Sequence, residues 1–152
     1  MDSEEQNKTR IDRHFKKFGH KMTKGRELTM RILAETDKHL SAEDVYLKVH
    51  AINNSVGLTS IYRTLEILVN MGVVSKFDFG DGRARYEMVE GYKNSKHHHH
   101  LICTSCGRII DYSDFLKEEK AFFKKIEGPL SKKHNFRITN HLVQFYGLCD
   151  RC

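Results

Sequence analysis

Residues 56–88, VGLTSIYRTLEILVNMGVVSKFDFGDGRARYEM, decide the fold of the first half of the chain. The apolar residues of the leading part follow the spacing of one buried helix face: Ile61, Leu65, Leu68 and Val69. Gly72 is expected to end this helix. The segments 73–79 and 83–88 then read as two strands around Asp81-Gly82, a strong signal for a hairpin turn.

Three further helices are predicted upstream of this stretch. Residues 4–19 read as a polar helix with a thin apolar stripe of Ile11, Phe15 and Phe18. Thr23 can cap the second helix, and Ser41, with Asp44 three positions on, begins the third in a capping-box-like arrangement. Helices followed by a β-hairpin are the pattern of a winged helix, so the sequence predicts a winged-helix domain over 1–88.

The helix after Gly57 has the features of a DNA-reading helix. Thr59 or Ser60 is expected to cap it, and its first turn would enter a major groove. Tyr62 offers a ring for a thymine methyl group and a hydroxyl for a phosphate, while Arg63 offers a forked donor for guanine or phosphate. The competing interpretation is a generic helical bundle with Tyr62 and Arg63 on its surface.

Positive charge is concentrated near the N-terminus. The whole chain carries +6, whereas residues 8–31 hold nine Lys or Arg against two acidic residues, a net +7. Within this segment, Lys21 could reach a minor groove and Arg26 could bind the backbone of DNA. A solvated helix face would show the same charge, so the segment supports nucleic-acid binding only together with the helix and hairpin.

The second half of the chain reads as a small α/β unit after a polar linker at 89–96. The predicted elements of this unit, 97–152, are strands at 101–103 and 108–112, a helix at 114–126 and a long strand at 136–146. Phe115, Phe122, Phe123 and Ile126 form the apolar side of that helix. The chain as a whole is therefore expected to be an α+β protein of two small domains joined by a hinge.

The cysteines form two Cys-x-x-Cys pairs: Cys103 with Cys106, and Cys149 with Cys152. In a reducing compartment this pattern favours metal over disulfides. Two residues between ligands let both sulfurs face one ion, and two pairs complete the closed tetrahedral shell of a structural Zn²⁺. A thiol redox motif and unrelated buried thiols are the competing interpretations, but the pairs use all four cysteines of the chain.

Four consecutive histidines, 97–100, precede the first cysteine pair. Side chains alternate between faces in an extended segment, so His98 and His100 would point one way, and His97 and His99 the other. The tetrad can thus supply two ligands to each of two metal sites, or serve one site with a spare pair. Other candidate ligands are spread along the chain: His39, Glu87, Asp111, Glu118 and His141.

Length and composition limit the classes of protein that fit. At 152 residues, neither half can bury a large core alone, and such halves usually need a metal or a partner subunit. No apolar run is long enough for a membrane span, and the N-terminus lacks the pattern of a signal peptide. The expected location is the cytoplasm.

Together these motifs resemble the ferric uptake regulator family over nearly the whole chain, from about residue 21 to 152. The segments that carry the resemblance are 39–46 (HLSAEDVY), 59–65 (TSIYRTL), 86–87 (YE), 97–106 (HHHHLICTSC), 107–112 (GRIIDY), 139–141 (TNH) and 146–149 (YGLC). The resemblance implies a homodimer with an N-terminal winged-helix DNA-binding domain, a hinge and a C-terminal α/β dimerisation domain.

The resemblance also implies two metal sites besides the zinc site. The regulatory hinge site matches His39, Glu87, His98, His100 and Asp111. The second site matches His97, His99, Glu118 and His141. The family often has Asp where this chain has His99, and the extra nitrogen ligand could suit zinc.

By this resemblance, the chain would be a metal-responsive repressor of metal-uptake genes that binds AT-rich palindromic double-stranded DNA. Fe²⁺ would be the co-repressor, with Mn²⁺ or Zn²⁺ able to substitute, and a tetramer stays open beside the dimer. Peroxide sensing and zinc sensing are the alternatives within the family. Asp111 occurs in the peroxide-sensing branch, but that branch tends to have Asp at the position of Glu87, and the iron-sensing interpretation is favoured.

Two other classes of function fit parts of the sequence. A His and carboxylate site with an open position could activate water in a metallo-hydrolase, but no Ser-His-Asp, Cys-His or phosphate-loop pattern stands near the ligands. A zinc-stapled module that binds protein partners would explain the cysteines alone. The sequence therefore predicts a non-enzymatic regulator.

Overall fold

The computed structural model describes residues 3–92 and 97–152. The chain divides into two compact units, Met1–Ser95 and Lys96–Cys152. The boundary between these units falls within the segment 89–96, the second half of which lies outside the described residues. No helix in the described ranges has both the length and the apolar character needed to cross a membrane.

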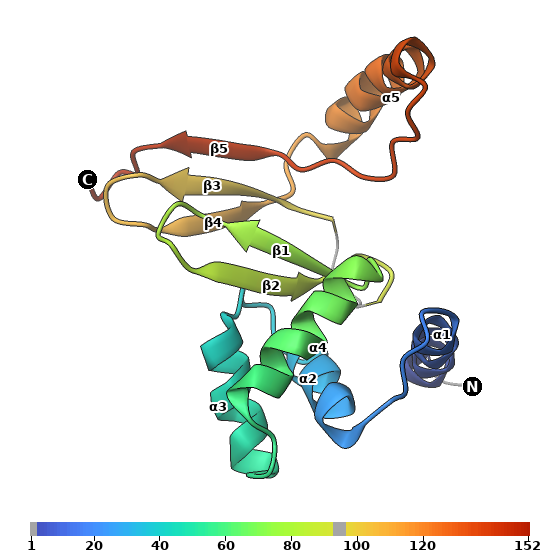
Figure 1. Cartoon of the computed structure of the whole chain (residues 1–152). Helices are drawn as coiled ribbons and strands as arrows, with labels where there is room; N and C mark the ends of the chain where they lie inside the picture. Colours follow the sequence, from blue (N-terminus) through green and yellow to red (C-terminus); the bar gives the residue numbers. More distant parts are fainter. Residues whose placement is uncertain (1–2, 93–96) are drawn as a thin grey trace. The chain divides into compact units, whose positions relative to one another are not determined.

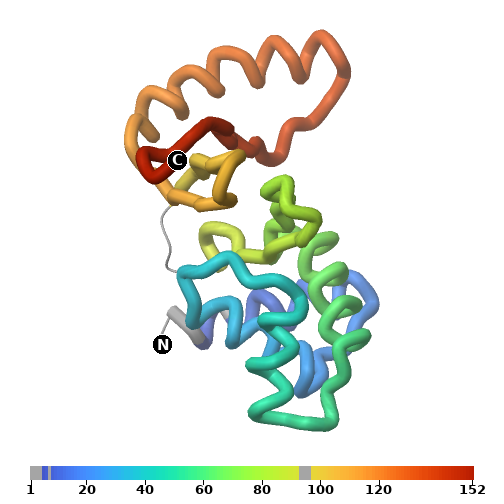
Figure 2. The backbone as a smooth tube through the Cα atoms, turned by 90° about the vertical axis from the view of Figure 1, so that its left-hand side faces the viewer, coloured from blue at the N-terminus to red at the C-terminus, as the bar shows by residue number. Residues whose placement is uncertain are grey.

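The N-terminal unit is built from helices and one hairpin (Figure 1). Its elements are α1 (Ser3–Lys17), α2 (Lys24–Ala34), α3 (Ala42–Ile52), α4 (Leu58–Asn70), β1 (Val74–Asp78) and β2 (Ala84–Met88). Figure 2 shows α2, α3 and α4 side by side, and each of the three contacts the other two. Three packed helices followed by an antiparallel hairpin form the winged helix that the sequence predicts.

Helix caps explain where α2 and α3 begin. The Thr23 hydroxyl accepts a hydrogen bond from the backbone N–H of Arg26 at 3.3 Å. Ser41 and Asp44 form a capping box, with the Asp44 N–H donating to Ser41 Oγ at 3.2 Å and the Ser41 N–H donating to Asp44 Oδ2 at 3.0 Å. These side chains satisfy N–H groups that the first helical turn leaves without a backbone partner.

The cap expected for α4 is wrong. The helix begins at Leu58 with Gly57 in the N-cap position, and no side chain caps it. Thr59 and Ser60 therefore lie inside the first turn, where both are exposed. Without a side-chain cap, the first N–H groups of α4 stay available for another acceptor.

The hairpin forms where it is predicted. β1 and β2 pair antiparallel from Val74 opposite Met88 to Asp78 opposite Ala84. The connecting loop is longer than a two-residue turn, and Gly80 and Gly82 both take positive φ, at 86° and 75°. A single bridge between Leu40 and Tyr86 ties β2 to the segment before α3.

One hydrophobic core holds the N-terminal unit together. It combines residues of all four helices with residues of the hairpin, among them Phe15, Leu28, Val45, Leu65 and Val74, which are at most 2% exposed. Phe18, expected on the buried stripe of α1, is instead 47% exposed beyond the end of that helix.

The C-terminal unit consists of a three-stranded sheet and one helix. Its elements are β3 (His99–Cys103), β4 (Ile109–Tyr112), α5 (Leu116–His134) and β5 (Gln144–Gly147). β3 lies in the middle, antiparallel to β4 and parallel to β5. Figures 1 and 2 show that α5 stands off from the sheet, and no described residue of α5 is buried.

Two predicted boundaries in this unit are wrong. The helix expected at 114–126 begins at Leu116 and continues to His134 with Pro129 inside it. A proline within a helix removes one backbone hydrogen bond, and here it does not end the helix. The long strand expected at 136–146 is reduced to β5, since β3 begins at His99 and its partner residues on β5 start only at Gln144. His141 consequently lies on the connection before β5.

Candidate metal centres and nucleic-acid interface

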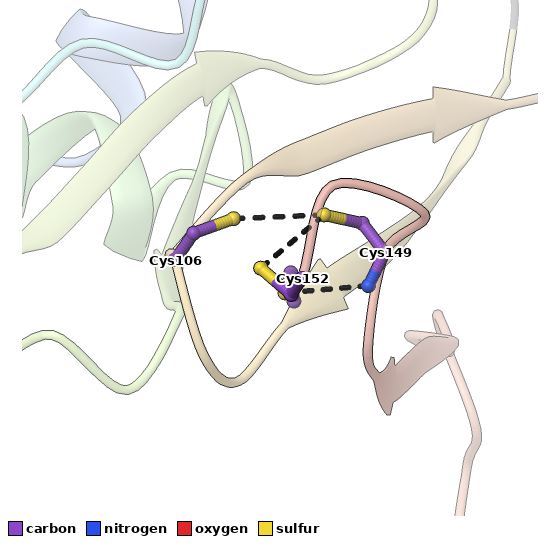
Figure 3. A group of neighbouring side chains, drawn as sticks. Cys106, Cys149 and Cys152 are labelled. Carbon is purple, nitrogen blue, oxygen red and sulfur yellow. Dashed lines mark hydrogen bonds between the residues drawn. The ribbon is translucent and has the colours of Figure 1, made fainter.

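The four cysteines come together at one end of the sheet. Cys103 ends β3, Cys106 lies in the turn that follows, and Cys149 and Cys152 follow β5. The Sγ atoms are 3.7 Å apart for Cys103 and Cys152, 3.7 Å for Cys106 and Cys149, and 3.6 Å for Cys149 and Cys152. Figure 3 shows the sulfurs of Cys106, Cys149 and Cys152 facing one another.

These sulfur separations fit a tetrahedral zinc ion. Zn–S bonds of about 2.3 Å at tetrahedral angles place sulfurs about 3.8 Å apart. All four sulfurs lie within 4.8 Å of one another, and all four cysteines are free rather than joined in disulfides. The donor set and its spacing therefore match a closed Cys₄ site.

The thiols of this cluster are electrostatically unlike one another. Backbone N–H groups of Cys106 and Cys149 lower the pKa of Cys103 to about 6. At Cys152, the hydrogen bond with Ser105 lowers the pKa, but the other three sulfurs together raise it to about 12. Crowded thiols resist ionising together, and a divalent cation among them would supply the charge that stabilises all four thiolates.

The histidine tetrad divides between two faces of the sheet, as alternation predicts. The rings of His97 and His99 are 4.6 Å apart, and those of His98 and His100 are 5.2 Å apart. His99 and His100 are 2% and 1% exposed. Buried imidazoles on both faces of one strand are polar groups that require partners, and each face provides some.

The first face joins His98 and His100 to Asp111. Asp111 lies opposite His100 in the antiparallel register of β3 and β4. Its carboxylate oxygens are 3.7 Å from His100 Nε2 and 4.0 Å from His98 Nε2. The C-terminal unit thus presents two imidazoles and one carboxylate at one place.

The opposite face joins His97 and His99 to His141. The ring centroids of His141 lie 5.9 Å from those of His97 and 6.0 Å from those of His99, and one nitrogen from each of the three histidines falls within a 4.8 Å group. Three imidazoles at this spacing can hold zinc or a similar ion.

Glu118, expected in this second cluster, is not brought into it. Glu118 is exposed on α5, whereas Glu119 Oε2 lies 2.5 Å from His99 Nε2. Glu127 Oε1 lies 3.4 Å from His141 Nδ1, and Phe123 stacks on the His141 ring with centroids 4.1 Å apart. Because residues 119, 123 and 127 share one helix face, the i, i+4 spacing is the signal that could have identified Glu119 and Glu127.

The N-terminal unit brings together the other two candidate ligands. His39 Nε2 lies 2.8 Å from Glu87 Oε2, and these side chains are only 8% and 11% exposed. The His39 ring lies nearly perpendicular to the rings of Phe77 and Phe79, with centroids 5.7 Å and 5.4 Å away. The N-terminal unit thus carries one imidazole and one carboxylate in a largely apolar setting.

The predicted DNA-reading residues lie on the surface of the N-terminal unit. Tyr62 and Arg63 are exposed on α4, and Tyr62 is 40% exposed. The start of α2 packs near the start of α4, since a Cβ added at Gly25 would lie 3.3 Å from the Val56 side chain. The two helices therefore begin on the same side of this unit.

Lys21 and Arg26 differ in their environment. Lys21 is exposed just before α2. Arg26 donates a hydrogen bond to the backbone carbonyl of Lys21 and lies 5.7 Å from the centroid of the Phe15 ring. Arg26 thus also braces the turn between α1 and α2, a structural role that the sequence did not indicate.

Comparison with known proteins points to one family. The model of the ferric uptake regulator family matches residues 17–146. The ferric uptake regulation protein of Bacillus subtilis (strain 168) is 39% identical over 145 residues, which cover 94% of this chain and 92% of that protein.

Solved structures of ferric uptake regulators are also similar to this chain. The ferric uptake regulator of Helicobacter pylori, described as having three functional metal binding sites, has a TM-score of 0.72 at 26% identity, covering 98% of this chain and 93% of that one. The regulator of Pseudomonas aeruginosa with manganese has a TM-score of 0.71 at 26% identity, covering 91% and 97%. The expected fold class is confirmed: an N-terminal DNA-binding domain and a C-terminal α/β dimerisation domain.

Members of this family are transcriptional regulators rather than enzymes, and they bind DNA as dimers. The metal clusters and the winged helix of the described residues are consistent with that activity. The chain belongs to the ferric uptake regulator family and is a metal-responsive transcriptional regulator.

Proposed function

We propose that this chain is an Fe²⁺-activated repressor of metal-uptake genes, acting in the cytoplasm. The observation that carries the proposal is the division of the hinge ligands between the two units. His39 and Glu87 belong to the N-terminal unit, while His98, His100 and Asp111 belong to the C-terminal unit. One ion bonded to both sets would make metal occupancy a condition for a fixed angle between the units.

The donor chemistry supports a divalent transition metal. Three imidazoles and two carboxylates suit Fe²⁺, Mn²⁺ or Zn²⁺, with the carboxylates favouring the harder ions. When bound, the ion supplies bonds that join the two units. The residues contribute pre-formed halves: β3 and β4 hold His100 beside Asp111, and the 2.8 Å contact holds His39 beside Glu87.

DNA recognition is assigned to the N-terminal unit. We propose that α4 enters the major groove with Tyr62 and Arg63, while Thr59 and Ser60 in its uncapped first turn bind phosphate. Lys21 would reach an adjacent minor groove, and Arg26 would support the backbone contact. In the dimer, metal at the hinge would set the spacing of the two α4 helices to about 34 Å or a multiple, as an AT-rich palindrome requires.

Two further sites complete the proposal. The cysteine cluster holds a structural Zn²⁺, which joins the segment after β5 to the end of β3. The second site uses His97, His99 and His141 with a carboxylate from α5. Glu118 is the carboxylate that the family motif indicates, but the 2.5 Å contact favours Glu119 in this chain. If zinc at this second site is kept in a Glu118→Ala variant and lost in a Glu119→Ala variant, while the zinc of the cysteine cluster stays bound in both, that assignment is supported.

Metal-dependent DNA binding tests the main proposal. The zinc-loaded chain is titrated with an AT-rich palindromic duplex under anaerobic conditions, with Fe²⁺, Mn²⁺ or Zn²⁺ or without added metal. We expect Fe²⁺ to raise affinity at least about tenfold, which requires about 1.4 kcal/mol of preference for the DNA-binding form. His98→Ala should abolish the response and Arg63→Ala should weaken binding with metal affinity unchanged. No response to any ion would overturn the repressor assignment.

Peroxide sensing is the second candidate, favoured by Asp111 in the hinge set. In that case, bound Fe²⁺ and peroxide would oxidise His39 or His98. Treatment of the iron-loaded chain with peroxide, followed by peptide mass spectrometry, would then show the addition of one oxygen at either residue. Iron-dependent DNA binding without any such addition would favour iron sensing. A response to Zn²⁺ alone would indicate zinc sensing.

A further inference from the structure

The hydroxyl of Tyr62 already has a protein partner. Tyr62 lies on α4, and its hydroxyl donates a hydrogen bond of 2.6 Å to Glu43 Oε1, in the first turn of α3. The two residues are 19 positions apart in the sequence and come from different helices. A short hydrogen bond from a hydroxyl to a carboxylate is of the stronger, charge-assisted kind.

The other oxygen of Glu43 faces the hairpin loop. Arg83 Nη2 lies 4.0 Å from Glu43 Oε2 and donates a 3.0 Å hydrogen bond to Ser41 Oγ. Glu43 therefore stands between the recognition helix on one side and the loop between β1 and β2 on the other. Its carboxylate is a fixed acceptor, partly neutralised by Arg83, rather than a freely rotating surface charge.

This arrangement decides which part of Tyr62 can meet DNA. A tyrosine hydroxyl has one proton to donate, and that proton points to Glu43. Phosphate oxygens only accept hydrogen bonds, and they are repelled by a neighbouring carboxylate. The hydroxyl is thus a poor phosphate ligand. Tyr62 as a whole is 40% exposed, and its ring can contact a thymine methyl group.

The protonation states needed for this hydrogen bond are stabilised. The Tyr62 hydrogen bond lowers the pKa of Glu43, and the same bond raises the pKa of Tyr62. Near neutral pH, Glu43 stays ionised as the acceptor and Tyr62 stays protonated as the donor.

We propose that Glu43 is a positioning residue of the DNA interface, which holds the Tyr62 hydroxyl and so directs the ring to a thymine methyl group. This inference rests on the proposed function of α4 as the reading helix. Because pairs between exposed groups add little stability, Glu43 should affect base discrimination and leave folding almost unchanged.

The test compares thymine with deoxyuridine, which lacks only the 5-methyl group. Thymines of the palindromic duplex are replaced one at a time, and affinity is measured by fluorescence anisotropy with the zinc-loaded full chain and Mn²⁺. The affinity of wild-type protein should fall about fourfold when the thymine at one position is replaced, which corresponds to the free energy of burying one methyl group. Glu43→Ala should bind thymine and deoxyuridine duplexes equally.

Three single variants and one double variant serve as controls for this result. Glu43→Gln keeps an oxygen that can accept from Tyr62 and should retain the discrimination. Glu66→Ala also removes one negative charge, but from α4, where Glu66 makes no hydrogen bond with Tyr62 among the described contacts. This variant should also retain the discrimination between thymine and deoxyuridine. Tyr62→Phe should lose discrimination as Glu43→Ala does, and the double variant should lose no more than either single variant.

A readout without DNA reports the hydrogen bond itself. In ring-labelled protein, the NMR signal missing from Tyr62→Phe identifies Tyr62, and its titration should move to lower pH in Glu43→Ala but not in Glu66→Ala. An unmoved titration would show that the hydrogen bond does not hold the hydroxyl, and would overturn the proposal.

The outcomes separate this inference from the proposed function. If Tyr62→Ala leaves DNA affinity unchanged, Tyr62 is not part of the DNA interface, and this inference fails together with the role proposed for Tyr62 on α4. If Tyr62→Ala weakens binding while Glu43→Ala keeps full discrimination, only the role of Glu43 is overturned. If Glu43→Ala and Glu66→Ala both bind the two duplexes more tightly and both keep the preference for thymine, Glu43 acts only as a negative charge that repels phosphate, which also overturns its positioning role.

Discussion

The two units of this chain reach stability by different means. The N-terminal unit has a continuous core of buried apolar residues drawn from α1 to α4, β1 and β2. Among the described residues of the C-terminal unit, the only buried apolar side chains are Ile102 and Cys103, and the only buried polar ones are His99 and His100. Most of what is buried in that unit is therefore a candidate metal ligand.

The surface of the C-terminal unit shows the same contrast. Large apolar side chains are exposed on α5, on β5 and around them: Phe115, Phe122, Leu130, Phe136, Leu142, Phe145, Tyr146 and Leu148. Exposed apolar surface of this kind marks an interface, and members of the family form dimers. We therefore expect the N-terminal unit to fold on its own core, and the C-terminal unit to need the proposed zinc and a partner subunit.

The largest expected effect is the loss of zinc from the C-terminal unit. Cys103→Ser removes one of four ligands, and structural zinc contributes on the order of 10 kcal/mol to the folding of small domains. We expect a monomer without zinc, in which the C-terminal unit is unfolded and the N-terminal unit keeps its helices. Zinc content, light scattering and circular dichroism measure this, and a folded dimer without zinc would contradict it.

A cavity in the N-terminal core should have the opposite effect: it should destabilise the N-terminal unit and leave the C-terminal unit intact. Leu65 is fully buried on α4, and Leu65→Ala should cost about 2–5 kcal/mol. The loss should lower the unfolding temperature of the N-terminal unit while the zinc-bound dimer persists. Simultaneous loss of zinc in this variant would show that the two units do not fold separately.

Charge on the exposed face of the C-terminal unit should separate the subunits. Phe145 is 56% exposed on β5, and Phe145→Glu would place a carboxylate where an apolar partner surface is expected. Burying an unpaired charge costs several kcal/mol, enough to convert the dimer to a monomer at micromolar concentration. A dimer of unchanged mass in light scattering would place the interface elsewhere.

The smallest expected effect concerns a single helix cap. Ser41→Ala removes the capping box of α3 and should cost about 1 kcal/mol of the unfolding free energy of the N-terminal unit. Hydrogen bonds from Ser41 lower the pKa of Asp44 below its ordinary 3.8. The stabilisation is therefore present above pH 3.8 and is lost as pH falls through the lower, folded-state value. Urea titrations should show the variant and wild type converging at acidic pH, and a constant difference would rule out this cause.

Local signals in the sequence were sufficient to predict most of the helices and strands of the N-terminal unit. Thr23, Ser41 and Asp44 cap the helices predicted for them, because a cap depends only on neighbours along the chain. At the start of α4, the N-cap position is occupied by Gly57 and not by the predicted Thr59 or Ser60, so no side-chain cap forms. Such a helix start is set by packing rather than by local preference.

The C-terminal unit was less predictable, because its structure depends on contacts between distant segments. Residues 136–143 have strand-forming composition, but a strand requires a neighbour, and the register of β3 reaches only to Gln144. Glu119 rather than Glu118 meets His99 because α5 begins at Leu116 and turns its 119, 123 and 127 face to the histidines. The alternation of side chains along residues 97–100 depends only on neighbours in the chain. It correctly predicted that His97 pairs with His99 and His98 with His100.

Hydrogen exchange with and without Fe²⁺ tests most directly whether one ion bonds both units. In wild-type protein, Fe²⁺ should slow exchange together in β2, which carries Glu87, and in β3 and β4, which carry His100 and Asp111. In His98→Ala, altered only in the C-terminal unit, the protection of β2 in the N-terminal unit should disappear. Protection confined to the C-terminal unit in wild type, or unchanged protection of β2 in His98→Ala, would contradict a shared ion.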